Sequence, residues 1–333
     1  MAKRFQVLLL VLGTFLLFSI RASAYDSVVD RISKSFNVQG RSRLVVQNDD
    51  GRTTIQPGSA NEVRIEVTKE VFHAKNEADA KKEADKVQVT LEQVGDRIEV
   101  RTIRPNWRFN FGGRPQVEIN YQIFAPAETD VSTKTSDGPV EVSGIHGNVQ
   151  ISSSDGDITF SDCNGDIDIQ SGDGDIHASK STGGIQISLR DGDLTASELS
   201  GQLVLKSSDG DVSVNAFNGK VDASSRDGKV DLNGVFTSLA AKSSDGDVDV
   251  TVQRGSVMQQ DWGLSSRDGD IQLRLPDDFS ADLAVRARDG KINTTVPVSV
   301  TGSLSENHLA GKLNGGGYLL DIQTSDGDIE IVR

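Results

Sequence analysis

The sequence predicts an all-β protein: a parallel β-solenoid whose coils are about 18 residues long and hold two short strands each. Glycine stands at every ninth position from Gly138 to Gly228, misses one step at Thr237, and returns at Gly246 and Gly255. The residues two and four positions after these glycines are apolar almost throughout, with polar residues between them. Alternation with a period of two indicates strands, and a fixed repeat of this length indicates stacked coils.

The first 24 residues have the composition of a secretory signal peptide. Lys3 and Arg4 precede an apolar run from Phe5 to Ile20, and a small-residue site ends at Ala24. We therefore expect cleavage before Tyr25. The alternative is a retained membrane anchor, because the apolar run is about long enough to cross a bilayer.

Residues 25–130 do not follow the nine-residue frame, and we expect them to form a β-rich cap on the first coil. Such a cap would cover a sheet edge that otherwise invites end-to-end pairing. Apolar alternation and Gly or Pro turns delimit the strands, and a run rich in Ala, Glu and Lys predicts one short helix. The expected strands are Arg41–Gln47, Arg52–Gln56, Glu62–Val71, Val87–Val94, Arg97–Ile103 and one through Val117, Ile119, Tyr121 and Ile123, and the expected helix is Glu77–Lys86.

Residues 131–333 form the predicted solenoid, with regular coils over 135–255 and longer coils over 256–333. Every second glycine follows an aspartate in a Ser-Asp-Gly or Arg-Asp-Gly turn, which makes the full repeat 18 residues. A further inward column is expected seven residues after these glycines. It contains Ile145, Cys163, Ser181, Leu199, Phe217 and Val235. Cys163 therefore reads as a small buried hydrophobe, since a reactive thiol needs polar or cationic neighbours.

The coils after Gly255 lengthen, because the turn glycines move to Gly269, Gly290 and Gly327. We expect the additional residues to bulge as loops, where binding specificity tends to lie. Trp262 falls in one of these insertions. An aromatic loop of the cap gives a second candidate surface, although packing of its aromatic side chains across the mouth of the solenoid is the favoured interpretation. The candidate partner-binding residues are Trp107, Phe109, Phe111 and Trp262.

Ten Asp-Gly turns, nine of them preceded by Ser or Arg, place aspartates along one predicted corner, and seven have a second aspartate after the glycine. The local interpretation is that Asp accepts hydrogen bonds from amides two residues on, while Gly supplies a positive φ. Stacked like charges repel, and Arg or Lys replaces a turn residue at Arg190, Arg226, Arg267, Arg288, Lys229 and Lys291. These cations should relieve the repulsion along the corner.

Calcium is the functional alternative for this corner, because nine-residue half-turns also build calcium-binding β-rolls. The weak candidates are Asp155, Asp157, Asp173, Asp175, Asp209, Asp211, Asp245 and Asp247. The substituted cations would interrupt a continuous file of ions, so turn chemistry is favoured and no cofactor is expected. Paired acids also allow a polysaccharide-active enzyme as the least favoured reading. The pair repeats on nearly every coil, however, so no catalytic residue is assigned.

Charge limits the partners. The chain has a formal net charge of −14, and removal of the three basic residues of the leader gives −17. Such acidity argues against nucleic acid and anionic membranes as partners. One cysteine in an exported chain leaves no internal disulfide, so stacking must supply stability.

The order of these elements resembles a known family. A Y-x-I-x-x-P-A strand at Tyr121–Ala127 leads into Lys134–Val142 and then into serial S-D-G-D turns. This is similar to the bacterial "putative adhesin" family of exported β-solenoid domains of unknown function, over roughly residues 40–333. The resemblance implies a non-enzymatic, periplasmic, cell-surface or secreted protein that binds or organises a cell-envelope protein or glycan.

Overall fold

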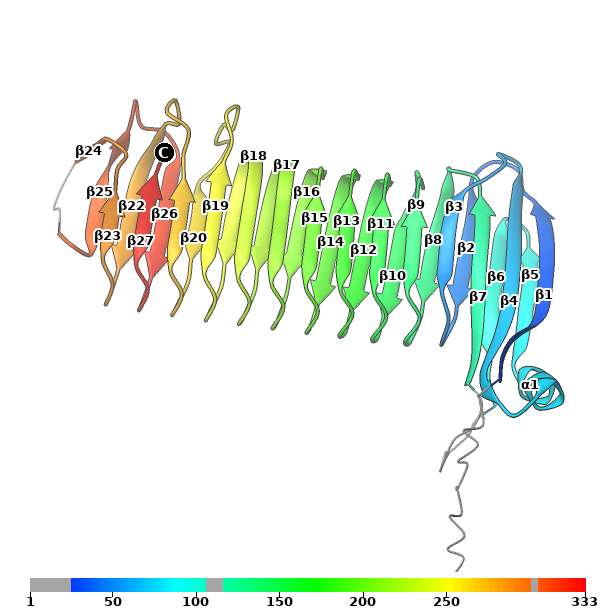
Figure 1. The fold of residues 1–333 in the computed structure, drawn as a ribbon. Coiled ribbons are helices and arrows are strands. Elements are labelled where there is room, and N and C mark those ends of the chain that lie inside the picture. The colour runs from blue at the N-terminus through cyan, green and yellow to red at the C-terminus, as the bar shows by residue number, and fades with distance from the viewer. Residues whose placement is uncertain (1–24, 106–115, 301–304) are drawn as a thin grey trace, which may run out of the picture.

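The computed structural model describes residues 25–105, 116–300 and 305–333. The expected leader, residues 1–24, and the aromatic loop with Trp107, Phe109 and Phe111 lie outside the described residues. The described parts contain 27 strands in one hydrogen-bonded network and one helix, α1 (Glu77–Ala84). The all-β class and the single short helix are therefore confirmed. Figure 1 shows an elongated stack with α1 at one end and the last strands at the other.

The middle of the stack is a regular parallel ladder. From β8 to β19, partners lie 18 residues apart in the chain, as in Ile158 beside Ile176 and Leu194 beside Val212. The strands are β8 (Thr129–Lys134), β9 (Val140–Ser143), β10 (Val149–Ser153), β11 (Ile158–Ser161), β12 (Asn164–Ser171), β13 (Ile176–Ser179), β14 (Thr182–Leu189), β15 (Leu194–Ser197), β16 (Ser200–Lys206), β17 (Val212–Ser224), β18 (Val230–Lys242) and β19 (Val248–Val252).

Strand pairing is mixed at the N-terminal end. β1 pairs antiparallel with β4, β4 with β7, and β5 with β6, whereas β2 and β3 join the parallel ladder through β8 and β9. The strands are β1 (Tyr25–Asn37), β2 (Ser42–Gln47), β3 (Thr53–Pro57), β4 (Glu62–Ala74), β5 (Gln88–Val94), β6 (Arg97–Ile103) and β7 (Gln116–Ala125). The sequence did not predict β1, because its polar residues hide the alternation.

The C-terminal coils are not stacked in chain order. β26 lies between β20 and β22, and β27 lies between β21 and β23, so the last segment returns into the stack. β25 and β24 then close the end by antiparallel pairing. The strands are β20 (Trp262–Ser265), β21 (Ile271–Arg274), β22 (Ala281–Ala287), β23 (Ile292–Thr294), β24 (Val298–Val300), β25 (His308–Leu313), β26 (Leu319–Thr324) and β27 (Ile329–Val332).

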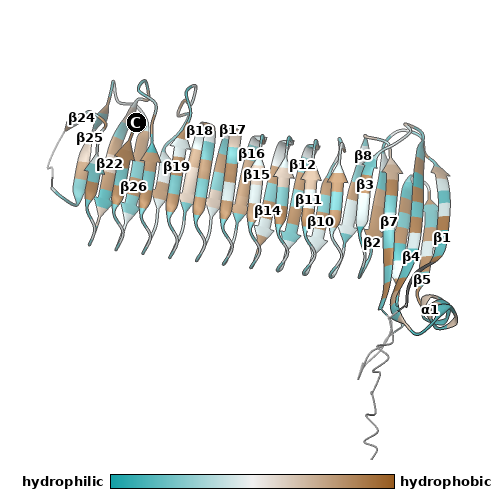
Figure 2. Cartoon of the chain, in the orientation of Figure 1, coloured by the Kyte–Doolittle hydropathy of each residue, from teal (hydrophilic) through white to brown (hydrophobic). Residues whose placement is uncertain are grey.

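The core runs the length of the stack between two rows of strands. Along the strands, buried apolar residues alternate with exposed polar ones, which gives the banding in Figure 2. Cys163 belongs to this core, with 1% of its surface exposed. Burial raises the pKa of its thiol, which suits an inert side chain.

One member of the predicted inward column is wrong. Phe236 is fully buried, whereas Val235 is only half-buried. The register between β17 and β18 shifts around Phe217, which pairs with Gly234. The preceding coils turn this corner with a positive φ, as at Ala216 (54°), whereas no residue of β18 has a positive φ. The inward position therefore moves by one residue.

Candidate functional site

The turn glycines are required by close stacking. A Cβ at Gly156 would overlap the carbonyl oxygen of Gly138 in the preceding coil, and the same contact recurs from Gly174 to Gly246. None of these Ser/Arg-Asp-Gly glycines has a positive φ, so the predicted reason is wrong for them. A positive φ occurs instead in the alternate series, for example 144° at Gly165.

The second aspartate of each turn links neighbouring coils. The carboxylate of Asp157 accepts a hydrogen bond from the backbone N–H of Asp175 at 3.0 Å. Asp175 accepts one from Asp193, and Asp193 from Asp211, both at 2.9 Å. The expectation of a bond to amides two residues on is therefore wrong for these residues, because the acceptor reaches the next coil instead.

The local turn bond belongs to a hydroxyl column that the sequence analysis missed. The N–H of Gly156 donates to Oγ of Ser153 at 3.0 Å, and this hydroxyl donates to the carbonyl of Gly156 at 2.8 Å. Related bonds occur at Ser171, Ser207, Ser225, Ser243, Ser266 and Thr324. A recurring Ser or Thr three residues before the glycine is the signal that could have revealed it.

Arginines neutralise part of the corner. Arg190 contacts Asp173 at 2.7 Å and Asp191 at 3.4 Å. The hydrogen bond from Arg190 holds the pKa of Asp173 below its usual value. Among the described residues, no cation forms an ion pair with Asp155, and its pKa is raised, first by desolvation and then by the neighbouring carboxyl of Asp137. The corner therefore alternates between paired and repelling carboxylates.

The calcium candidates are occupied by protein contacts at several positions. Asp157 and Asp211 accept backbone N–H groups of the next coil. Asp173 and Asp209 each receive an arginine at 2.7 Å. Within the part of the chain that the structure describes, no group of three or more His, Cys, Asp or Glu side chains is arranged to hold a metal ion.

Trp262 is not an exposed partner-binding residue, so that prediction is wrong. Its side chain is 1% exposed, and it packs against Phe236 and Phe279 with ring centroids 6.3 and 5.2 Å apart. β20 begins at Trp262, so this residue belongs to a strand and faces the core. The inserted loop ends before it. The sequence analysis placed Trp262 in the loop because the repeat could not be followed beyond the register shift at β18.

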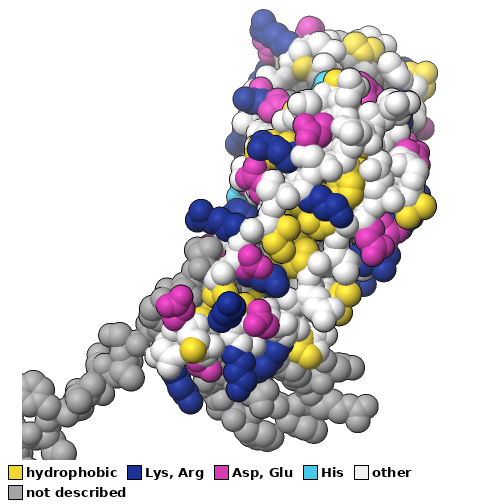
Figure 3. Space-filling model, turned by 90° about the vertical axis from the view of Figure 1, so that its right-hand side faces the viewer, with side chains coloured by type: hydrophobic (Ala, Val, Ile, Leu, Met, Phe, Trp, Pro, Cys, Tyr) yellow, Lys and Arg dark blue, Asp and Glu magenta, His cyan; other side chains and the backbone are white. Residues whose placement is uncertain are grey.

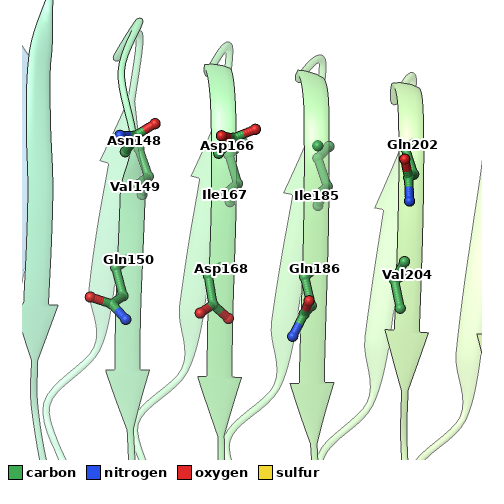
Figure 4. A pocket seen from close by; sticks show the side chains of 11 residues that line it. Asn148, Val149, Gln150, Asp166, Ile167, Asp168, Ile185, Gln186, Gln202 and Val204 are labelled. Carbon is green, nitrogen blue, oxygen red and sulfur yellow. The ribbon is translucent and has the colours of Figure 1, made fainter.

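A shallow groove crosses the outer face of β10, β12, β14 and β16. It has a volume of about 540 Å³, and Figure 4 shows its lining side chains in two rows along the stack. We call it the lateral groove. Its lining residues are Asn148, Val149, Gln150, Asp166, Ile167, Asp168, Gly184, Ile185, Gln186, Gln202 and Val204.

Gly184 creates much of the hollow. In one row, Gly184 stands between Asp166 and Gln202, so a side chain is missing from the middle of the face. A Cβ at Gly184 would approach only Oδ1 of Asp166, at 3.0 Å, and no positive φ constrains this glycine. Backbone strain therefore does not explain the glycine, and the open space is available to a ligand.

The groove offers hydrogen-bonding groups of mixed kind. In the second row, Asp168 lies between Gln150 and Gln186. Oδ1 of Asp168 is shielded from solvent and accepts no hydrogen bond from a described residue. Amides both donate and accept, whereas carboxylates only accept. Since no Lys or Arg lines the groove, it suits a ligand rich in hydroxyl donors.

A family assignment follows from comparison with known proteins. The model of the Toastrack DUF4097 family matches residues 41–225 and again 216–332. The chain belongs to the Toastrack DUF4097 family. The two matches together span the parallel ladder, the lateral groove and the returning C-terminal segment. No curated protein matches this Toastrack chain.

Several solved structures are similar to this Toastrack protein at low identity. A putative adhesin from Parabacteroides distasonis shares 8% identity with a TM-score of 0.41, covering 91% of this chain and 97% of its own. A putative adhesin from Parabacteroides merdae shares 10% with a TM-score of 0.38, covering 91% and 96%. A putative lipid binding protein from P. distasonis shares 12% with a TM-score of 0.35, covering 91% and 97%. At such values the similarity says nothing of what this chain binds.

The membrane question has one structural finding. Within residues 25–105, 116–300 and 305–333 of this Toastrack chain, no helix has the length and apolar character needed to cross a bilayer.

Proposed function

We propose that the chain is an exported, non-enzymatic β-solenoid that binds a neutral glycan of the cell envelope through the lateral groove. The observation that carries the proposal is the hollow at Gly184, flanked by the carboxylate of Asp168 and by the amides of Gln150 and Gln186. Sugar hydroxyls donate hydrogen bonds, which carboxylate oxygens and amide oxygens can accept. Asp166 and Asp168, the two aspartates of the groove, would repel an anionic polymer, so a neutral polymer is favoured.

The proposed organisation assigns residues 1–24 to a leader removed on export to the periplasm, cell surface or medium. Residues 25–130 then cap the stack, and residues 131–333 form the solenoid that presents the groove. Repetition supports a binding role over catalysis, because the same pair of carboxylates recurs on successive coils and no single coil stands out as an active site. We propose that binding needs no metal ion, so an excess of chelator should leave both affinity and melting temperature unchanged.

The test is binding of residues 25–333 to neutral and anionic cell-wall polysaccharides by affinity electrophoresis and calorimetry. Gly184→Gln fills the hollow without straining the backbone, so we expect it to weaken binding at least about tenfold while leaving the melting temperature unchanged. Thr195→Gln is the matched control, because Thr195 is exposed on β15 in the opposite sheet. Equal affinities of the two variants, or preference for the anionic polymers, would contradict the proposal.

A further inference from the structure

The N-terminal end of the stack carries two free strand edges. In the parts of the chain that the structure describes, β1 pairs only with β4, and β5 pairs only with β6. The second edge of each strand therefore has no strand partner. β1 is 13 residues long, and a long unpaired edge is a template for pairing with another chain.

Apolar side chains are incompletely covered at this end. Val29 and Ile32 on β1 and Val89 on β5 pack against the core but remain partly exposed. Figure 3 looks onto this end and shows hydrophobic side chains gathered in its middle, among Lys, Arg, Asp and Glu at the periphery. An apolar centre with a polar rim is the usual composition of a protein interface.

The opposite end of the stack is a poorer docking surface. It also leaves three core-packed hydrophobic residues partly exposed, at Ile292, Val296 and Val298. Its edge strands β23 and β24, however, are three residues long each. Short edge strands are a common protection against pairing, so the two ends differ in the length of ladder they could add.

The sequence of β1 is complementary to itself in antiparallel orientation. When two copies of β1 pair about Ile32, Asp30 of one copy stands opposite Lys34 of the other, and the reverse pair forms by symmetry. Directly opposite residues of an antiparallel pair share a face, so these charges attract. Lys34 is held at this end, because its ammonium donates to the carbonyl of Leu91 at 2.7 Å and lies 4.8 Å from the Phe36 ring centroid. Two of its three donors stay available.

We propose that two copies of this chain associate end to end through their β1 edges, antiparallel about Ile32. A two-fold axis normal to the strands relates the two β1 edges, as expected for an isologous dimer. The sheet that contains β1 then continues from one copy into the other, and the apolar centre of each end is covered. The dimer would present two lateral grooves on one rigid rod, which favours polymers over short ligands. The association itself does not rest on the proposed function.

The test is sedimentation velocity of residues 25–333 over a wide concentration range. We expect a concentration-dependent dimer. Asp30→Lys and Lys34→Asp should each raise the dimer dissociation constant by about tenfold or more, because each places like charges opposite one another twice. A mixture of the two variants should recover the dimer, since every pair is then attractive. Recovery cannot come from a merely unfolded variant.

The matched control is Arg31→Glu, a charge reversal next to Asp30 that stands opposite Ser33 in the proposed register. We expect it to dimerise as the unmodified chain does. A chain that stays monomeric at all concentrations would overturn the proposal. So would a dimer that neither Asp30→Lys nor Lys34→Asp weakens, because the contact would then lie elsewhere on the molecule.

Discussion

The carboxylates of the turn corner do different work although they recur in the same motif. The second aspartate, as in Asp157, binds a backbone N–H of the next coil and so replaces a ladder bond at the corner. The first aspartate faces its copies in the coils above and below, and its charge must be screened or paired. Asp173 is paired with Arg190, whereas the pKa of Asp155 is raised by desolvation and by the neighbouring carboxyl of Asp137. Identical residue types therefore differ in pKa along one column.

We predict that Arg190→Ser lowers the melting temperature at neutral pH and makes it more dependent on salt. Arg190 depresses the folded-state pKa of Asp173, so this pair contributes stability above the unfolded pKa of the carboxyl. That contribution is lost as pH falls through the depressed folded pKa. The difference between the variant and the parent chain should therefore shrink in acid and in high salt.

Thermal melts from neutral pH to acid, at low and high salt, measure this effect. Arg190→Lys serves as the control, because it keeps a positive charge beside Asp173 and should retain most of the neutral-pH stability. A deficit of Arg190→Ser that is constant over the whole pH range would show that the arginine acts through packing instead of charge.

The glycine columns give a second prediction at this scale. Gly192→Ala should destabilise the chain by roughly 1–3 kcal/mol, because the new Cβ overlaps the carbonyl oxygen of Gly174 and one coil must shift from the next. Gly184→Ala is the control, since its Cβ approaches only the flexible side chain of Asp166. Urea unfolding should separate the two variants. Similar losses of unfolding free energy in the two variants would mean that the destabilisation comes from replacing glycine itself and not from the close spacing of the coils.

Among the elements, β18 departs most from the repeat. It lacks the positive φ with which the preceding coils turn the corner, and its Phe236 stacks on Phe217 with ring centroids 6.1 Å apart. We predict that Phe236→Ala destabilises the chain by about 3–5 kcal/mol, the range for a fully buried aromatic. Val235→Ala should cost far less, because Val235 is half-buried. Chemical denaturation of both variants tests whether Phe236 is the inward residue. A larger loss for Val235→Ala than for Phe236→Ala would show that Val235 is the inward residue, as the repeat predicted.

The periodicity predicted the elements that repeat and failed where local exceptions decide the structure. The inward residues of β10 to β17 follow from alternation alone, because each coil must bury the same face. The inward position moves to Phe236 because β18 lacks the corner that the preceding coils have. The sequence of that one coil does not reveal the missing corner. β1 was missed because its apolar residues are separated by Asp30 and Lys34, and only pairing with β4 makes it a strand.

In the candidate site, too, the local pattern was predicted and the contacts between coils were not. The turn aspartates were predicted as structural residues, but the backbone N–H groups that donate to their carboxylates lie 18 residues away, a distance that local turn chemistry does not consider. The sequence analysis did not predict the lateral groove. Its hollow arises because Gly184 breaks a row of side chains contributed by four separate coils, and this contrast appears only when the coils are superposed.

For the whole molecule, the returning C-terminal segment makes the stack cooperative in a way that a simple linear repeat is not. The coil of β26 and β27 lies between the coil of β20 and β21 and that of β22 and β23. A repeat array normally loses only its last unit on truncation, because each unit contacts only its neighbours. Here the last segment of the chain is an interior unit of the stack.

We therefore predict that a chain ending at residue 318 loses hydrogen-exchange protection over 281–313, although those residues are still present. Their inner partner is absent, and β22 retains only β25. Protection over 129–252 should persist, since its own ladder is intact. Ile322→Asp, which places a charge at a fully buried position of β26, should give the same pattern without shortening the chain. Retained protection over 281–313 in both variants would mean that this coil docks directly on β20 and β21, and that the stacking order has no energetic consequence.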